Sequence, residues 1–422
     1  MKIIAADFLL PISSEPIGDG AVAIEGGVIV EVGRLSALRA KYQDTEIEDF
    51  GAAVILPGFV NCHSHLEITA MRGQLDSVEN DFGAWLLKLT KLRSEMSAEA
   101  IEESAYNGAL EGALAGVTCF GDIGRSGVAG MKGLVRAGLR GVVYQETEFS
   151  PNDATADGDF ARLVDKFDGA RVLESSIVRA GISPHAPYTV SRKLFELIGL
   201  YAAREGIKVS IHVAESAEEE AFMTEGGGAF AEIFAESGVE WSCPRSTSLR
   251  YLYETGVLEA APLLAHCITV NKEEIEIIRR TGSGVAHCPK SNAKFGHGYA
   301  PFEFMLDADI AVGLGSDSVA SNNVCDILEE ARFAALAARN RTGSNRFVSP
   351  REVLEAATLG GARALGLDDL IGTIEPGKQA DLAVVALGHP AQQPISDVEA
   401  ALVFSSNARD VVRTMVAGRA VG

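Results

Sequence analysis

The stretch from Val54 to Glu67 carries a short apolar run into a pair of histidines, His63 and His65. Residues two apart on an extended strand point to the same side, so both imidazoles can converge on one ion at the end of a strand. Pro57 and Gly58 interrupt the run, which indicates that a new unit begins there. Taken alone, the pair could equally be two histidines at a strand end that only form hydrogen bonds. The rest of the chain decides between this interpretation and a metal site.

Short apolar strands alternate with helical stretches through the middle of the chain. Helical stretches such as 98–115 and 192–204 are each followed by glycine and an apolar segment. Counting a first strand around Ile55, the expected strands are completed by 116–120, 138–144, 179–182, 206–211, 263–265, 285–286 and 310–314. This succession predicts a parallel α/β sheet. Eight units in roughly 300 residues favour a closed (β/α)₈ TIM barrel over an open sheet. An open sheet of this kind would be expected to have a Gly-rich phosphate loop after its first strand, and the sequence has none.

Both ends of the chain read as β structure. Segments 21–24 and 28–32 flank Gly26-Gly27, which is typical of a hairpin turn, and segments 372–385 and 411–418 read as turns and strands. We therefore expect a small β-sandwich domain made from residues 1–56 plus 368–422. The catalytic barrel domain would then span residues 57–367.

Composition excludes several kinds of partner. The 422 residues include 58 acidic and 37 basic ones, for a formal charge of −21, so neither nucleic acid nor an anionic membrane is expected to bind. The first residues lack the apolar core of a signal peptide, and no run of about 18 apolar residues occurs, which predicts a cytoplasmic protein. The six cysteines form no CxxC pair, so most are expected to be small buried apolar residues rather than disulfides or zinc ligands.

Polar residues follow three further strands of the expected barrel. His212 and Glu215 follow the fifth strand, His266 the sixth and Asp317 the eighth. Active groups of such barrels lie at the carboxyl ends of the strands. His63, His65, His212 and Asp317 together offer three imidazoles and one carboxylate, a set suited to Zn²⁺ or another divalent first-row metal. Any one of them could be a buried core residue, but jointly they predict a metal site.

The chain resembles the amidohydrolase superfamily, in its branch of cytosine, guanine and adenosine-type deaminases and triazine hydrolases. The resemblance covers nearly the whole sequence. The stretches that carry it are 57–67 (PGFVNCHSHLE), 183–188 (SPHAPY), 212–216 (HVAES), 287–292 (HCPKSN), 314–323 (LGSDSVASNN) and 372–382 (GTIEPGKQADL). It implies a distorted barrel with a terminal β-sandwich. Because the expected fourth strand, 178–185, lacks the lysine of two-metal members, it also implies a single divalent ion, Zn²⁺ or alternatively Fe²⁺.

The same resemblance assigns catalytic roles. Glu215 would protonate a ring nitrogen and pass the proton to the leaving group, Asp317 would accept the proton of the attacking water, and His266 would orient the hydroxide or stabilise developing charge. The neighbouring Glu218, Glu219 and Glu220 read as a solvated acidic patch.

Several residues are expected to contact the substrate. His185 matches the substrate-orienting histidine of the family. The other expected contacts are Glu67, Trp85, Glu148, Ser318 and Asn322. His287 is expected to support a loop, His297 is a candidate for the pocket wall, and His389 is expected at the surface.

Within the branch, several features resemble the aminodeoxyfutalosine deaminases, among them Gly121-Asp122-Ile123 and Gln145-Glu146. Leu89, Thr90 and Lys91 replace an acidic residue that ribose-binding adenosine and S-adenosylhomocysteine deaminases tend to carry. The expected reaction is therefore metal-dependent hydrolytic deamination of an adenine-type nucleoside, by a homo-oligomer. The alternatives are deamination of another purine, a pterin or a pyrimidine, dechlorination of a triazine, or a non-catalytic binding protein on the same fold.

Overall fold

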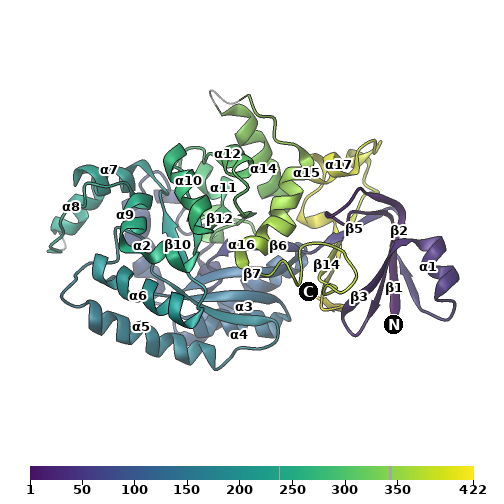
Figure 1. Ribbon diagram of the computed structural model, residues 1–422, viewed down its shortest axis with the longest axis horizontal. Helices are drawn as coiled ribbons and strands as arrows, with labels where there is room; N and C mark the ends of the chain where they lie inside the picture. The colour runs from purple at the N-terminus through teal and green to yellow at the C-terminus, as the bar shows by residue number, and fades with distance from the viewer. Residues whose placement is uncertain (237, 342–344) are drawn as a thin grey trace.

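The computed structural model of the protein (Figure 1) describes residues 1–236, 238–341 and 345–422. Within these residues, eight parallel strands alternate with helices and form two four-stranded sheets in chain order. The first sheet contains β6 (Phe59–Ser64), β7 (Val117–Gly124), β8 (Arg140–Glu146) and β9 (Val178–Ser183), and the second contains β10 (Ser210–Val213), β11 (Leu263–His266), β12 (Gly284–His287) and β13 (Val312–Leu314).

Backbone hydrogen bonds bridge the two sheets on both sides. The Ile182 N–H donates to the Lys208 carbonyl, and the Asp317 N–H donates to the His63 carbonyl, each at 2.9 Å. The eight strands thus follow one another around a ring with two irregular junctions, and this is the distorted (β/α)₈ barrel that the sequence predicts.

Helices on the outside of the barrel begin and end where the sequence supplies caps. The Ser191 side chain accepts a hydrogen bond from the Leu194 N–H at the start of α6 (Arg192–Glu205), and Gly206 ends this helix with a φ of 65°. The predicted helices at 98–115 and 192–204 are confirmed as α3 (Ala98–Leu114) and α6. The remaining long outer helices are α4 (Gly127–Ala137), α5 (Ala156–Arg171), α10 (Lys272–Thr281) and α14 (Ile327–Asn340).

A third sheet combines strands from both ends of the chain, and in Figure 1 its purple and yellow strands lie together beside the barrel. Its order is β16-β15-β14-β5-β1-β2-β3, with β4 paired to β1. The strands are β1 (Lys2–Leu9), β2 (Ile17–Glu25), β3 (Val28–Arg34), β4 (Ile47–Asp49), β5 (Ala53–Pro57), β14 (Leu382–Ala386), β15 (Val411–Val416) and β16 (Arg419–Val421). The predicted Gly26-Gly27 hairpin is confirmed, with φ values of 59° and 86°.

This terminal sheet curls back on itself. The Ile29 N–H donates to the Lys378 carbonyl and the Gly377 N–H donates to the Ile29 carbonyl, both at 2.8 Å, so β3 meets the segment that precedes β14. The curled sheet encloses a core to which both chain ends contribute, including Ile4, Val22 and Val384. It is the sandwich-like unit that the sequence predicts, whereas the division at residues 56 and 368 stays a proposal.

The prediction that the first barrel strand lies around Ile55 is wrong. β5 pairs with β14 and β1 in the terminal sheet, and the first barrel strand is β6, which begins after Gly58. The side chains of β5 and β6 are all buried, so hydrophobicity alone cannot assign either strand to its sheet. A Cβ at Gly58 would lie 2.1 Å from Cγ2 of Thr118, so the chain passes between the two sheets where only glycine fits.

A buried ion pair connects the barrel to the terminal sheet. Arg140, at the start of β8, donates from Nε and from a terminal guanidinium nitrogen to the two carboxylate oxygens of Asp381, at 2.8 and 3.1 Å. Asp381 also accepts a hydrogen bond from the Ala417 N–H. Both side chains are almost fully buried, so the pair fixes the barrel wall against the segment that leads into β14.

Two other features concern the whole chain. No helix among the described residues has both the length and the apolar character needed to cross a bilayer. The cysteines are free thiols, and all except the half-buried Cys243 are buried, as predicted.

Candidate metal centre and active site

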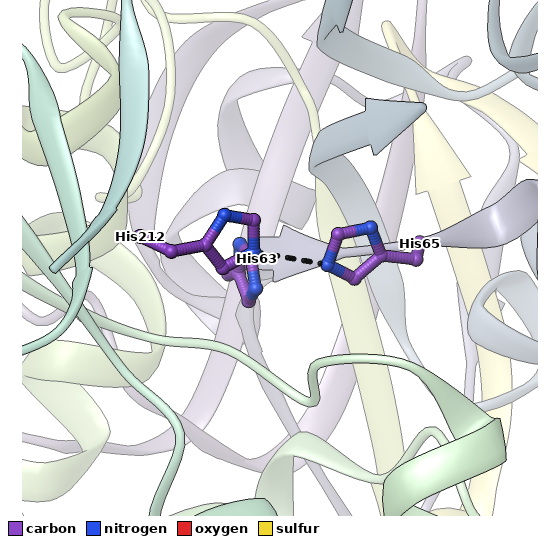
Figure 2. A group of neighbouring side chains, drawn as sticks. All are labelled: His63, His65 and His212. Atoms are coloured by element: carbon purple, nitrogen blue, oxygen red, sulfur yellow. Dashed lines mark hydrogen bonds between the residues drawn. The ribbon is translucent and has the colours of Figure 1, made fainter. Parts of the chain in front are cut away.

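Four predicted ligands lie together at the carboxyl ends of the barrel strands. His63 and His212 belong to β6 and β10, His65 follows β6 directly, and Asp317 follows β13. Figure 2 shows the three imidazoles directed toward one another. The Asp317 Oδ1 lies 3.4 Å from His63 Nε2 and 3.6 Å from His65 Nε2, and the Nε2 atoms of His65 and His212 are 3.2 Å apart. The structure therefore brings these four side chains together around one point.

The hydrogen bonds of the imidazoles indicate which ring atoms carry lone pairs. The Nδ1 atoms of His65 and His212 each contact a backbone carbonyl, of Ile123 and His185 respectively, at 3.0 Å. Because a carbonyl only accepts, the hydrogen of each ring is on Nδ1, and the two Nε2 atoms face each other as acceptors. Both ring nitrogens of His63 are buried with no hydrogen-bond partner among the described residues.

Buried acceptors at such short separations repel each other unless a cation lies between them. Imidazoles that donate Nδ1–H to a carbonyl and present Nε2 inward are the usual arrangement around a metal ion. The donor set and the unpartnered atoms therefore fit a divalent ion.

Electrostatics keep these groups in the protonation states that coordination needs. Burial lowers the pKa of His63 to about 4 and lowers the pKa of His212 well below its ordinary value. Burial alone would raise the pKa of Asp317, but its close contact with His63 and the surrounding histidines hold that pKa well below its usual range. At neutral pH the imidazoles of His63 and His212 are therefore neutral and the Asp317 carboxylate is ionised, as metal binding requires.

Serines hold the Asp317 carboxylate in place. Ser291 and Ser321 donate their hydroxyl hydrogens to Oδ2 of Asp317, at 2.6 and 3.0 Å, which leaves Oδ1 directed at the histidines. Ser291 belongs to the short helix α11 (Pro289–Lys294), and the next residue, Asn292, has its Oδ1 3.1 Å from His266 Nδ1. One turn of helix therefore positions two site residues at once.

A buried acid lies beside this centre. Glu215 has an Oε1 atom 3.7 Å from His266 Nε2, and both side chains are buried. Burial, with a further contribution from the negative charge of Asp317, raises the pKa of Glu215 well above its ordinary value. The raised pKa favours the protonated form of Glu215, which can donate a proton inside the site.

Strained turns present these groups. Ala214, His266 and Asp317 have positive φ values of 54°, 72° and 56°, which non-glycine residues rarely adopt. Each lies where a barrel strand ends. Such backbone strain concentrates at functional sites, where the surrounding structure holds it.

Glu219 does not belong to a solvated patch, so that prediction is wrong for this residue. Its carboxylate is buried and accepts hydrogen bonds from the N–H groups of Ala214 and Glu215, at 2.9 and 2.8 Å. Ser216 caps α7 (Ala217–Glu225) and accepts from the Glu219 N–H, which turns the Glu219 side chain back onto the strained turn. Glu218 is exposed, as predicted.

The predicted substrate contacts His185 and Glu67 lie on one side of the centre. His185 is partly buried, its Nδ1 lies 2.7 Å from the Thr189 hydroxyl, and its Nε2 lies 4.0 Å from Glu146 Oε1. Burial lowers the pKa of His185 to about 4. Glu67 is buried, and its carboxylate accepts hydrogen bonds from the Arg93 guanidinium and from the N–H groups of Arg125 and Ser126.

The other predicted contacts have diverse surroundings. Trp85 lies in α2 (Phe82–Ser94), is 6% exposed and packs edge-on against Phe295. The Glu148 side chain is 48% exposed and pairs with Lys166 and Arg125. Ser318 caps the short helix α13 (Val319–Asn322), and Asn322 donates to the Ser316 carbonyl and to Glu330. Contact of these residues with a substrate stays a prediction.

The remaining histidines differ in burial. His287 ends β12 and stacks on Phe302 with ring centroids 5.0 Å apart, and His297 lies edge-on to Phe82. Burial lowers the pKa of His287 to about 3 and that of His297 to about 4. His389 is exposed, as predicted.

Glu146 is the site residue that sequence reasoning passed over in favour of Glu148. It ends β8, is 4% exposed, and has one oxygen 3.3 Å from the Arg125 Nε atom. The signal was its place in the strand, because the last residue of a barrel strand points into the site, whereas a residue two positions later lies in the loop. The predicted strand ended at residue 144, two residues before the true end of β8, so Glu146 was assigned to the loop.

The fold and these side chains define an α/β barrel with a candidate metal centre at the carboxyl ends of its strands. The amidohydrolase family profile matches residues 54–421, and a shorter match to an imidazolonepropionase-like composite domain of bacteria covers residues 20–42. Because the first match spans most of the chain, the protein belongs to the amidohydrolase family.

Known relatives match over nearly the whole chain. The 5-methylthioadenosine/S-adenosylhomocysteine deaminase of Moorella thermoacetica is 34% identical, with 99% of this chain and 93% of the relative covered. The 5'-deoxyadenosine deaminase of Methanosarcina acetivorans is 32% identical, with 95% and 87% covered.

Solved structures show the same architecture. An adenosine deaminase from Xanthomonas campestris with bound zinc superposes with a TM-score of 0.85 at 28% identity, covering 99% of this chain and 92% of that one. A Helicobacter pylori aminofutalosine deaminase has a TM-score of 0.80 at 24% identity, and both chains are fully covered. An atrazine chlorohydrolase from Arthrobacter aurescens has a TM-score of 0.82 at 23% identity, with 100% and 95% covered. At such identities, the last two show the fold alone.

Proposed function

We propose that the protein is a metal-dependent hydrolytic deaminase of an adenine-type nucleoside that carries an extension at its 5' carbon. The observation that carries this proposal is Glu215, a buried acid with a raised pKa, 3.7 Å from His266 and next to the cluster of three imidazoles and a carboxylate. The names of the relatives, deaminases of 5-methylthioadenosine, S-adenosylhomocysteine and 5'-deoxyadenosine, support the same substrate class. Aminodeoxyfutalosine, another 6-aminopurine nucleoside, stays a candidate within it.

His63, His65, His212 and Asp317 would hold the ion, and the zinc in the Xanthomonas campestris structure makes Zn²⁺ our first choice. A bound divalent ion supplies a water molecule with a pKa low enough for hydroxide to form near neutral pH. The rest of the chemistry belongs to side chains of the protein.

Deamination requires an acid that serves twice. Hydroxide adds to the amino-substituted ring carbon only if the adjacent ring nitrogen is protonated, and the amine then departs only if it receives a proton. Glu215 is protonated when the substrate arrives, so it gives its proton to the ring nitrogen. Asp317 takes up the proton of the attacking water, and His266 orients the attacking oxygen. Glu215 would take a proton back from the newly added hydroxyl group and give it to the amine, which leaves as ammonia. The proton held by Asp317 would then restore the protonated form of Glu215.

A panel of amino-heterocycles tests this proposal. Zinc-loaded protein is incubated with 5-methylthioadenosine, S-adenosylhomocysteine, 5'-deoxyadenosine, aminodeoxyfutalosine, adenosine, guanine, cytosine and a chlorotriazine, and ammonia and chloride are measured. We expect ammonia from the 5'-modified aminopurine nucleosides, with conversion of the base to the 6-oxo form. Chloride release, or ammonia release confined to pyrimidines, would overturn the proposal. Glu215→Gln serves as the inactive control.

We further propose that the active form is a cytoplasmic homo-oligomer. The family resemblance supports assembly, and the small-molecule substrate is a metabolite rather than nucleic acid or lipid. Light scattering coupled to gel filtration measures the mass in solution, and fractionation of cells measures the compartment. A purely monomeric protein, or one found outside the cytoplasm, would contradict this part of the proposal.

A further inference from the structure

Glu146 presents one unpartnered carboxylate oxygen to the site. The residue ends β8 and is almost fully buried, and its Oε2 atom is 3.3 Å from the Arg125 Nε atom. Among the described residues, no donor forms a hydrogen bond with the other oxygen, Oε1. The nearest polar neighbour recorded for Oε1 is His185 Nε2, at 4.0 Å. Oε1 is not among the fully buried, unpartnered side-chain atoms of the described residues, so it borders open space at the site, where a donor can reach it.

His185 cannot be that donor while its ring is neutral. Its Nδ1 lies 2.7 Å from the Thr189 hydroxyl, and that hydroxyl donates its own hydrogen to the Ala186 carbonyl, at 3.1 Å. The Thr189 oxygen therefore accepts, and the ring hydrogen of His185 is on Nδ1. This leaves a lone pair on Nε2, so two acceptors, Glu146 Oε1 and His185 Nε2, lie 4.0 Å apart with no donor between them.

We propose that Glu146 Oε1 and His185 Nε2 together bind two adjacent hydroxyl groups of the substrate, the vicinal diol of a ribose. This inference rests on the proposed function and adds to it the sugar specificity of the same site. Each hydroxyl donates one hydrogen, so a diol satisfies both acceptors at once. A free base lacks this pair of donors, and an anionic substituent would meet the Glu146 carboxylate directly.

The main rival occupant of this space is a second metal ion, since Glu146, His185 and His212 each offer a ligand atom within 4.8 Å of the others. Arg125 argues against it. Its guanidinium group already pairs with Glu146, and its positive charge next to the carboxylate opposes another cation. Glu67 holds the loop that carries Arg125, because its carboxylate accepts the backbone N–H of Arg125 at 3.2 Å.

A substrate-by-variant cycle tests the proposal. In the wild-type enzyme we expect kcat/KM for adenosine to exceed that for 2',3'-dideoxyadenosine by about 10–100-fold, because hydrogen bonds to a charged acceptor are among the strong ones. In Glu146→Gln this preference should shrink about tenfold, mainly through a higher KM for adenosine, because the dideoxy compound has no hydroxyl groups for Glu146 to bind. Glu103→Gln, at an exposed ion pair with Arg136, is the matched control and should keep the wild-type preference.

Several outcomes would overturn the inference. One is a wild-type enzyme that does not distinguish the two nucleosides, and another is an equal loss for both in Glu146→Gln, which would mean that Glu146 only supports the structure. Two metal ions per wild-type chain and one in Glu146→Gln would assign the space to a metal. If the wild-type protein deaminates neither nucleoside, and none of the 5'-modified aminopurine nucleosides either, the proposed function fails. Calorimetric binding of inosine and 2',3'-dideoxyinosine then decides the inference separately, with equal affinities counting against it.

Discussion

The Nε2 atoms of His65 and His212 face each other at 3.2 Å, although each ring keeps its hydrogen on Nδ1 for a backbone carbonyl. Two lone pairs are stable at that separation only with a cation between them. His63 lies within the same group, and Asp317 Oδ1 is 3.4 Å from His63 Nε2 and 3.6 Å from His65 Nε2.

We therefore expect one tightly bound divalent ion per chain. His63→Ala should lose metal and activity together, because a three-ligand remnant binds more weakly. Elemental analysis of the purified proteins is the measurement, and His389→Ala, which removes an exposed imidazole, is the control. Two ions per wild-type chain, or none after reconstitution with zinc, would contradict this expectation.

Glu215→Gln should keep the metal and lose turnover by about 10²–10⁴-fold, because an amide cannot transfer the proton that the ring nitrogen and the amine need. Steady-state kinetics and metal analysis are measured on the same sample. Glu218→Gln, three residues along in the exposed part of the same segment, should behave as wild type. Loss of the metal from Glu215→Gln would instead make Glu215 a ligand.

Ser291→Ala should weaken metal binding or activity by about 10–100-fold without unfolding the protein, as is typical for groups that orient a ligand. The reason is that Asp317 Oδ2 loses its 2.6 Å hydrogen bond and the carboxylate can rotate away from the histidines. Competition with a chromogenic chelator measures the affinity. Ser210→Ala is the matched control, since its buried hydroxyl has no partner among the described residues. Equal effects of the two substitutions would sink the assignment.

Asp122 should make stability fall as pH rises. Burial, reinforced by the charge of Glu67, raises the pKa of Asp122 to about 8 in the folded protein, whereas the unfolded value is near 4. Between these values the folded state holds a proton that the unfolded chain has released, so this contribution to stability is complete below about pH 4 and declines up to about pH 8.

Asp122→Asn removes this titration and keeps the oxygen that accepts the Leu66 N–H at 2.8 Å. Urea unfolding at pH 6 and pH 9 measures it. The free energy of unfolding of the variant minus that of the wild type should be larger at pH 9 than at pH 6. A difference between the two proteins that does not change with pH would show that Asp122 titrates normally.

Asp381→Ala should destabilise the protein by about 3–5 kcal/mol, because it leaves the Arg140 guanidinium buried without its partner. Chemical denaturation followed by circular dichroism gives the change in the free energy of unfolding. Glu103→Gln breaks the exposed pair with Arg136 and should change stability very little. If both substitutions had equally small effects, the buried pair would not contribute to the contact between barrel and terminal sheet.

The parts of the site that depend on strand ends could be predicted, since the carboxyl ends of parallel strands meet at one edge. His63, His65, His212 and Asp317 come together for this reason, and their role as ligands remains to be tested. The assignment of Ile55 failed because β5 and β6 are consecutive strands that are both fully buried, so burial does not show which sheet each strand joins. Sheet membership is determined by pairing with strands that are distant in the sequence, and the hydrophobic pattern of a strand does not identify those partners.

The positions of Glu219 and Glu146 were not predicted from the sequence, for different reasons. In a run of acids, only the capping geometry of Ser216 selects Glu219 for burial, and that geometry depends on the strained turn at Ala214. Glu146 and Glu148 differ by two positions, which is within the error of a strand boundary but moves a carboxylate from the site to solvent.

The terminal sheet imposes an order on synthesis of the protein. β5 pairs with β14 at Pro57 and Leu382, so about 300 residues are translated between two neighbouring strands. At roughly 5–20 residues per second, β5 emerges from the ribosome on the order of 15–60 s before its partner. During that time the edge of a wholly apolar strand stays open next to the segment that carries His63 and His65, and open apolar edges invite pairing with other chains. Pairing with β1 covers one edge of β5 early, whereas the other edge is covered only when β14 has been synthesised.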